Sequence, residues 1–162
     1  MPEAHVSGRI GLPIGDVWEF IKDMKNWAPC MPGYISFEEV DDTVSIWRLK
    51  GDVGLFQRAV SFTVTITEKV PPERIAFTLD AKADGITGGG MYRARPAGEN
   101  ETEMEFALEL NGVGMARPVI NALLAKTLPR DVQKLKDNLV DVLGRLERRE
   151  APAGGSDAAG TP

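Results

Sequence analysis

The sequence is poor in the side chains that hold metals or form covalent cross-links. Its 162 residues include one cysteine, Cys30, and one histidine, His5. A single cysteine cannot form an internal disulfide bond, which is typical of proteins in the reducing cytoplasm. One cysteine and one histidine are also too few for a zinc site of the usual type. We therefore expect a cytoplasmic protein with no metal and no other cofactor.

Long apolar runs and clusters of basic residues are also missing. The longest stretch without a charged residue, 26–37, contains two prolines and falls short of the roughly 18 apolar residues that a membrane span requires. The N-terminus lacks the basic region and apolar core of a signal peptide. The net charge is −5, and basic residues do not cluster before the last helical turns. We therefore expect no nucleic-acid partner and at most transient contact with membranes.

What the sequence does contain is a regular alternation of polar and apolar residues. This period of two predicts β-strands over 5–12, 34–40, 44–54, 55–70, 75–85, 88–96 and 102–110. Apolar spacings of three and four predict helices over 13–24 and from Pro118 to Leu146. A short helix over 24–30 is expected to end at the prolines that follow, and Pro129 predicts a kink in the long helix.

This order of elements predicts an α+β fold class. We expect a curved antiparallel sheet of about seven strands wrapped round a long C-terminal helix, with two short helices after the first strand. Each strand has one apolar face, as in antiparallel sheets with one face in solvent. Hydrophobic residues make up 43% of the chain, enough for one globular domain, which we place at 1–149. Residues 150–162 are small, polar and rich in Gly and Pro, which predicts a disordered tail.

The candidate reactive residues form no catalytic constellation. Cys30 would need a neighbouring base or cation to become a thiolate, and His5 lies on the polar side of the first strand. The carboxylates grouped in 38–42 and 101–105 are expected on solvated faces. The run GITGGG, 85–90, lacks the lysine and the following helix of a phosphate-binding loop, so its glycines predict a hairpin corner or a bulge. We expect no catalytic residue.

The remaining candidate site is the apolar face of the sheet together with the facing side of the long helix. From the pattern alone, these residues form either a solid core or the wall of a ligand pocket. A cavity of roughly 300 Å³ left empty would cost about 7 kcal/mol, so a real cavity is expected to hold an apolar molecule. Tyr92 and Thr127 would supply its polar contacts. The candidate ligand-binding residues are Trp47, Leu49, Phe62, Val64, Phe77, Leu79, Tyr92, Met104, Phe106, Leu108, Ile120, Leu123, Leu124 and Thr127.

Two segments carry a resemblance to a known family. The first is DVWEFIKDMKNWAPCMPGYISFEEV, 16–40, in which a Val-Trp helix precedes the turn Cys30-Met31-Pro32-Gly33. The second is DVGLFQRAVSFTVTITEKVPPERIAF, 52–77, which contains a Pro-Pro-Glu-Arg turn. Together with the Gly-rich segment 84–90, they resemble the G-type accessory proteins of carbon monoxide dehydrogenase, a family of the START/SRPBCC superfamily. The similarity extends over roughly 4–146.

The resemblance implies a helix-grip fold with a hydrophobic cavity between the sheet and the long helix. It also implies binding or carrying of a lipid- or quinone-like molecule, as accessory protein of a carbon monoxide dehydrogenase-type molybdenum enzyme. A redox enzyme complex would then be a partner, while the oligomeric state stays open. Two alternatives differ in class. One is an enzyme of the polyketide cyclase/aromatase type, and the other is a protein-interaction module with a filled core.

Overall fold

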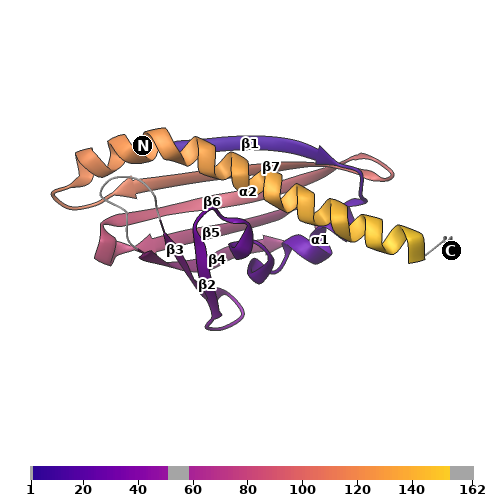
Figure 1. Cartoon of the computed structure of the whole chain (residues 1–162), viewed down its shortest axis with the longest axis horizontal. Helices are drawn as coiled ribbons and strands as arrows, with labels where there is room; N and C mark the ends of the chain where they lie inside the picture. The colour runs from indigo at the N-terminus through magenta and orange to yellow at the C-terminus, as the bar shows by residue number, and fades with distance from the viewer. Residues whose placement is uncertain (1, 51–58, 154–162) are drawn as a thin grey trace.

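The computed structural model describes residues 2–50 and 59–153, and Figure 1 shows one long helix lying across a sheet of long strands. Residues 51–58, which belong to two of the predicted strands, and the tail residues 154–162 lie outside this part. The elements in chain order are β1 (Glu3–Ile10), α1 (Ile14–Ile21), the 3₁₀ helices η1 (Met24–Asn26) and η2 (Ala28–Cys30), β2 (Tyr34–Glu39), β3 (Val44–Lys50), β4 (Ala59–Val70), β5 (Arg74–Ala81), the 3₁₀ helix η4 (Lys82–Asp84), β6 (Ile86–Gly98), β7 (Glu101–Gly112) and α2 (Arg117–Ala153).

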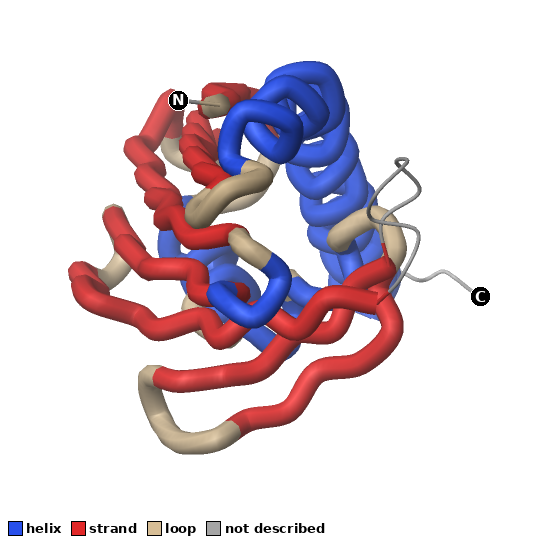
Figure 2. Tube along the Cα trace, turned by 90° about the vertical axis from the view of Figure 1, so that its left-hand side faces the viewer, coloured by secondary structure: helices blue, strands red, loops and turns tan. Residues whose placement is uncertain are grey.

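The seven strands form a single antiparallel sheet in the order β1-β7-β6-β5-β4-β3-β2. From β3 to β7, each strand pairs with the one before it in the chain. The first strand, β1, pairs with the last, β7, and so completes the sheet. Figure 2 shows the sheet curving round the side of α2. The predicted α+β fold, a curved seven-stranded sheet with a long C-terminal helix, is confirmed.

The period of two along the strands places the apolar side chains on the inner face of the sheet. Trp47 lies opposite Phe62 across β3 and β4, and Val64 lies opposite Leu79 across β4 and β5. The hydrophobic core combines the inner-face residues with one side of α2 and with buried residues of α1 and of the segment after it, such as Ile21 and Trp27. The local alternation in the sequence therefore determines which side chains face the helix.

Helix α2 lies over one side of the sheet only. It packs mainly against β1, β7 and η2. Its residues Leu139 and Leu143 are buried, and the Asn138 Nδ2 donates a hydrogen bond of 2.8 Å to the carbonyl oxygen of Cys30. The helix continues through Pro129, whose side chain is exposed. Because α2 is held against the β1–β7 side, the inner faces of β3, β4 and β5 lie farther from it.

The short helix predicted over 24–30 is instead two 3₁₀ helices, η1 and η2, on either side of Trp27. Pro29 sits in the first turn of η2, where it lacks an N–H group and restricts the residue before it, so a regular α-helix cannot form. This geometry turns Trp27 inward. Its indole ring makes edge-to-face contacts with Phe77, Tyr92 and Phe106, at centroid distances of 5.9, 6.0 and 5.5 Å.

The prediction of a hairpin corner or bulge at Gly88–Gly90 is wrong. These glycines lie inside β6, in unbroken register with β5, and the turn is made by η4 and Gly85, whose φ is +75°. The sequence has glycine at these positions because larger side chains of neighbouring strands occupy the space over β6. A Cβ at Gly90 would lie 2.5 Å from the Phe77 ring, and one at Gly88 would lie 2.8 Å from the Leu110 side chain. The glycines thus admit larger neighbours on the inner face.

Candidate functional site

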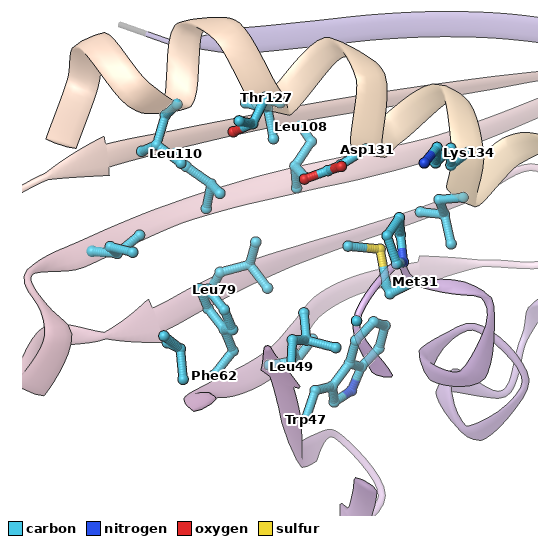
Figure 3. Close-up of a pocket in the computed structure, with 18 of the residues that line it drawn as sticks. Met31, Trp47, Leu49, Phe62, Leu79, Leu108, Leu110, Thr127, Asp131 and Lys134 are labelled. Carbon is cyan, nitrogen blue, oxygen red and sulfur yellow. The ribbon is translucent and has the colours of Figure 1, made fainter. Parts of the chain in front are cut away.

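A pocket of about 300 Å³ lies between α2 and the part of the sheet that the helix does not cover. Figure 3 shows its walls: Phe62, Leu79 and Leu108 stand on the sheet, and Thr127 and Asp131 point down from α2. The lining is mainly aliphatic and aromatic. Ligand pockets in proteins have this character and begin at roughly this volume.

The structure brings nine of the fourteen candidate ligand-binding residues into this pocket. Their positions follow from the inner-face register of β3 to β7 and from one stripe of α2. Leu124 supplies part of the helix wall, and Thr127 follows three residues later on the same side. The nine lining residues are Trp47, Leu49, Phe62, Val64, Phe77, Leu79, Leu108, Leu124 and Thr127.

The other five candidates lie elsewhere. Tyr92, Met104 and Phe106 are buried in the core, at the end of the sheet that Trp27 covers. Ile120 packs over the backbone at Gly112. A Cβ added to Gly112 would lie only 2.8 Å from the Cβ of Ile120. Leu123 is half-buried on α2 outside the lining. The period of two places residues on a face but does not say how far along the strand the pocket extends.

Several lining residues were absent from the candidates derived from the sequence. Trp27 reaches the pocket from its position between η1 and η2. Val60 and Leu128 share the apolar spacing of their neighbours, so the periodicity contained a signal for both. Met31, Pro32, Gly33, Lys50, Ile86, Leu110, Arg130, Asp131, Lys134 and Leu135 complete the additional lining. Most of the polar residues in this set lie at the mouth of the pocket. A search for an apolar face in the sequence does not select charged residues.

On one side of the pocket mouth, a backbone hydrogen bond connects the Pro32–Gly33 turn to the end of β3. The Lys50 N–H donates a hydrogen bond of 2.8 Å to the Gly33 carbonyl oxygen. Gly33 has a φ of +80°, and a Cβ there would collide with the Lys50 carbonyl oxygen. Only glycine suits this conformation and this close approach. The turn that carries the family resemblance therefore forms one side of the pocket mouth.

The two indole N–H groups that line the pocket are already engaged. Trp47 Nε1 donates to Ser45 Oγ at 2.9 Å, and Trp27 Nε1 donates to the Ile21 carbonyl oxygen at 2.7 Å. The hydroxyl of Thr127 donates to the Leu123 carbonyl oxygen at 3.3 Å. It keeps its capacity to accept a hydrogen bond. Apart from this hydroxyl, the described residues in the body of the pocket offer a ligand apolar contact.

The groups that first suggested reactivity do not meet in this pocket. His5 lies on the outer face of β1, where its Nε2 is 3.2 Å from Glu105 Oε2. Cys30 is buried, and burial raises the pKa of its thiol, which keeps it protonated and weakly nucleophilic. Among residues 2–50 and 59–153, no group of three or more His, Cys, Asp or Glu side chains is placed to hold a metal ion.

Tyr92 is fully buried, and its hydroxyl has no hydrogen-bond partner within the described residues. Burial also raises the pKa of this phenol well above its ordinary value. The residue lies beside Trp27 and Phe106 rather than in the pocket lining. It therefore does not offer a ligand the polar contact that was expected of it in this conformation.

Comparison with protein families gives a match over most of the chain. A family model described as "Polyketide cyclase / dehydrase and lipid transport" matches residues 1–144. No curated protein sequence matches. In the part of the chain described above, none of the helices has the length and apolar character needed to cross a membrane.

Solved structures share the fold at low sequence identity. A conserved protein from Geobacillus kaustophilus is similar with a TM-score of 0.74 and 12% identity, covering 88% of this chain and 95% of that one. The Zhui aromatase/cyclase from Streptomyces sp. R1128 has a TM-score of 0.69 and 20% identity, with 95% and 98% covered. A START superfamily protein from Mycobacterium smegmatis has a TM-score of 0.65 and 12% identity, with 89% and 98% covered.

Proposed function

The chain belongs to the polyketide cyclase/dehydrase and lipid transport family, and we propose that it binds and carries a hydrophobic small molecule in the pocket beneath α2. The observation that carries this proposal is the pocket itself. Its walls are apolar, its volume is about 300 Å³, and its indole donors are occupied by protein acceptors. A lipid- or quinone-like molecule fits such walls, because it gains from apolar contact and needs few hydrogen bonds.

The energetic argument favours an occupant. The pocket opens to solvent at its mouth, so without a ligand its apolar walls face water. An apolar molecule that displaces this water gains free energy in proportion to the apolar area that it buries. We expect the ligand to be exchangeable, because exposed residues of α2 line the mouth.

A finer assignment rests on the resemblance to the G-type accessory proteins of carbon monoxide dehydrogenase. In this proposal the protein serves a molybdenum-containing enzyme of the carbon monoxide dehydrogenase type by handling a quinone-like molecule near it. The supporting observation is the segment Cys30–Gly33, whose turn forms part of the pocket mouth. Affinity purification of the tagged protein from its native cells tests this. Components of a molybdenum hydroxylase should co-purify, and their absence under mild extraction would remove this assignment but not the carrier proposal.

The alternative is a polyketide cyclase/aromatase-like enzyme acting on an aromatic or polyketide substrate. It is favoured by the family description and by the resemblance in fold to an aromatase/cyclase. In this case Asp131 and Thr127, both lining the pocket, would move protons during ring closure. Asp131→Asn would then abolish conversion of a poly-β-ketone analogue while apolar ligands still bind. Turnover unaffected by this change would exclude the assigned role.

A pocket-filling variant tests the carrier proposal. Leu79 lines the pocket on β5, so Leu79→Trp should reduce binding of a neutral apolar dye, Nile red, and of decylubiquinone by about tenfold or more. Leu146→Trp, a change at a partly exposed position of α2 outside the lining, is the matched control and should bind normally. Fluorescence titration gives the affinities, and circular dichroism checks folding.

Two further measurements keep this test decisive. Thr127→Trp fills the pocket from the helix side and replaces Leu79→Trp if the latter fails to fold. Native mass spectrometry of freshly purified protein should show a co-purified apolar molecule. Absence of any bound species, together with no uptake of dye or quinone by the unmodified protein, would overturn the proposal.

A further inference from the structure

The mouth of the pocket carries a charge opposite in sign to that of the whole chain. Among residues 2–50 and 59–153, its charged lining residues are Lys50, Arg130, Asp131 and Lys134. Within this described lining, three cationic side chains against one carboxylate leave a surplus of two positive charges. The chain as a whole has a net charge of −5. A local reversal of this kind next to an apolar pocket attracts anions to the mouth.

The single carboxylate in this group is paired within the mouth. Arg130 Nε lies 3.4 Å from Asp131 Oδ1. By contrast, the structure shows no ion pair for the ammonium groups of Lys50 and Lys134 within residues 2–50 and 59–153. Two lysines of the mouth are therefore available to an anion that arrives from outside.

Lysines elsewhere show that pairing is common on this surface. Lys22 lies 2.8 Å from Glu19, Lys25 lies 3.4 Å from Asp23, and Lys136 lies 2.8 Å from Asp137. The two lysines of the mouth come from different elements. Lys50 is the last residue of β3, and Lys134 belongs to the part of α2 that lines the pocket. In that stretch, Thr127, Asp131 and Lys134 share one face of the helix, and Figure 3 shows the last two side by side along it.

The distribution of polarity also sets an orientation. The indole N–H groups inside the pocket donate to protein acceptors. The cationic lining residues Lys50, Arg130 and Lys134 are exposed and therefore lie at the mouth. A ligand that buries an apolar body beneath α2 would leave its polar end beside Lys50 and Lys134. A cationic end would meet two positive charges there, whereas an anionic end would pair with them.

The geometry points to an amphipathic anion as the ligand class: an apolar body that ends in a carboxylate or a phosphate held by Lys50 and Lys134. This inference rests on the proposed function, because it names the ligand of the same pocket. The apolar body supplies most of the binding free energy, and the acidic group supplies selectivity and orientation. A fatty acid and a lipid phosphate share this chemistry.

A series of compounds with the same alkyl chain and different head groups tests the inference. Dodecanoate, dodecyl phosphate, dodecanol and dodecylamine compete with Nile red, and their affinities are compared at low salt. We expect the two anions to bind roughly fivefold to tenfold more tightly than dodecanol, and the amine to bind more weakly. The difference should shrink as the salt concentration rises. Whichever of dodecanoate and dodecyl phosphate binds more tightly distinguishes a fatty acid from a lipid phosphate.

Variants connect the preference to the two lysines. Lys50→Gln/Lys134→Gln should abolish the preference for anions, so that dodecanoate, dodecyl phosphate and dodecanol bind with similar affinity. Lys126→Gln, an exposed lysine of α2 outside the lining, is the matched control and should keep the full preference. Equal binding of dodecanoate and dodecanol by the unmodified protein would overturn this inference and leave the carrier proposal standing. If none of the four compounds displaces the dye, and the dye itself does not bind, the carrier proposal fails instead.

Discussion

The two halves of the space under α2 are built from the same kinds of residues but differ in packing. At one end, Trp27 stands between the sheet and the helix, and its ring contacts Phe77, Tyr92 and Phe106. At the other end, Phe62 and Leu79 line a pocket of about 300 Å³. Apolar composition therefore does not distinguish core from pocket in this molecule. The outcome depends on whether a bulky side chain from a third element fills the gap.

The turn that carries Trp27 is therefore the structural boundary between the two halves. Its indole N–H is held by the Ile21 carbonyl oxygen at 2.7 Å, and Asn138 of α2 holds the Cys30 carbonyl oxygen at 2.8 Å. The first bond joins the Trp27 side chain to the backbone of α1, and the second joins the Asn138 side chain to the backbone of η2, so the region is fixed to α1 on one side and to α2 on the other. The closed half is thus stabilised by contacts that the open half does not have.

The largest effect is expected from removing the boundary itself. Trp27→Ala should lower the free energy of unfolding by about 3–5 kcal/mol, because it deletes a buried aromatic ring and leaves a cavity. If the variant folds, the pocket should extend into the formerly closed half and accept bulkier apolar ligands. Urea unfolding measures the first effect and a ligand-size series measures the second. A loss below about 1 kcal/mol would contradict the role of Trp27 as the filler of this half.

A matched pair of truncations compares the two halves directly. Phe106→Ala, in the closed half, should cost about 3–5 kcal/mol of stability because Phe106 is only 2% exposed. Phe62→Ala, in the pocket wall, should cost less than about 2 kcal/mol, because its ring already borders open space. Phe62→Ala should in turn weaken binding of the apolar dye. Equal losses of stability in the two variants would show that the halves are packed alike.

The smallest effect concerns the unpaired hydroxyl of Tyr92. Tyr92→Phe should raise the free energy of unfolding by about 1 kcal/mol, because the substitution removes a buried hydroxyl without a partner among the described residues. Urea unfolding at neutral pH measures this change. A clear loss of stability would instead indicate that the hydroxyl has a partner in solution.

The same residue gives the protein an alkaline sensitivity. Burial raises the pKa of Tyr92 in the folded state above its ordinary value of about 10. As the pH rises above about 10, the unfolded state loses this proton while the folded state keeps it, so stability falls. The loss of unfolding free energy between about pH 8 and about pH 11 should therefore be larger for the unmodified protein than for Tyr92→Phe.

Much of the architecture was predictable because it depends on local periodicity. Alternation along the strands identified the inner face, and spacings of three and four identified α2. The glycines of β6 were misassigned because their function depends on Phe77 and Leu110, which are distant in the sequence. Likewise, the helix expected over 24–30 is replaced by two 3₁₀ helices, in a region where Trp27 inserts into the core.

The candidate site was predictable only in part for a related reason. Seven of the nine candidates that line the pocket share the inner face of the sheet, and Leu124 and Thr127 belong to one stripe of α2. Tyr92, Met104 and Phe106 share that inner face but lie in the closed half. The charged residues of the mouth carry no apolar signal. Lys50 and Lys134 belong to it only because β3 ends near the Gly33 turn and α2 passes above that turn.

The order of the elements, and the face on which each apolar side chain lies, can be read from the amino-acid sequence without any structure. Both follow from periodicity, which reflects the geometry of a single strand or helix. The positions where the interior is solid and where it is open follow from the three-dimensional packing alone. They depend on the separation between α2 and the sheet, and on one indole ring, that of Trp27, carried into the gap by residues 24–30.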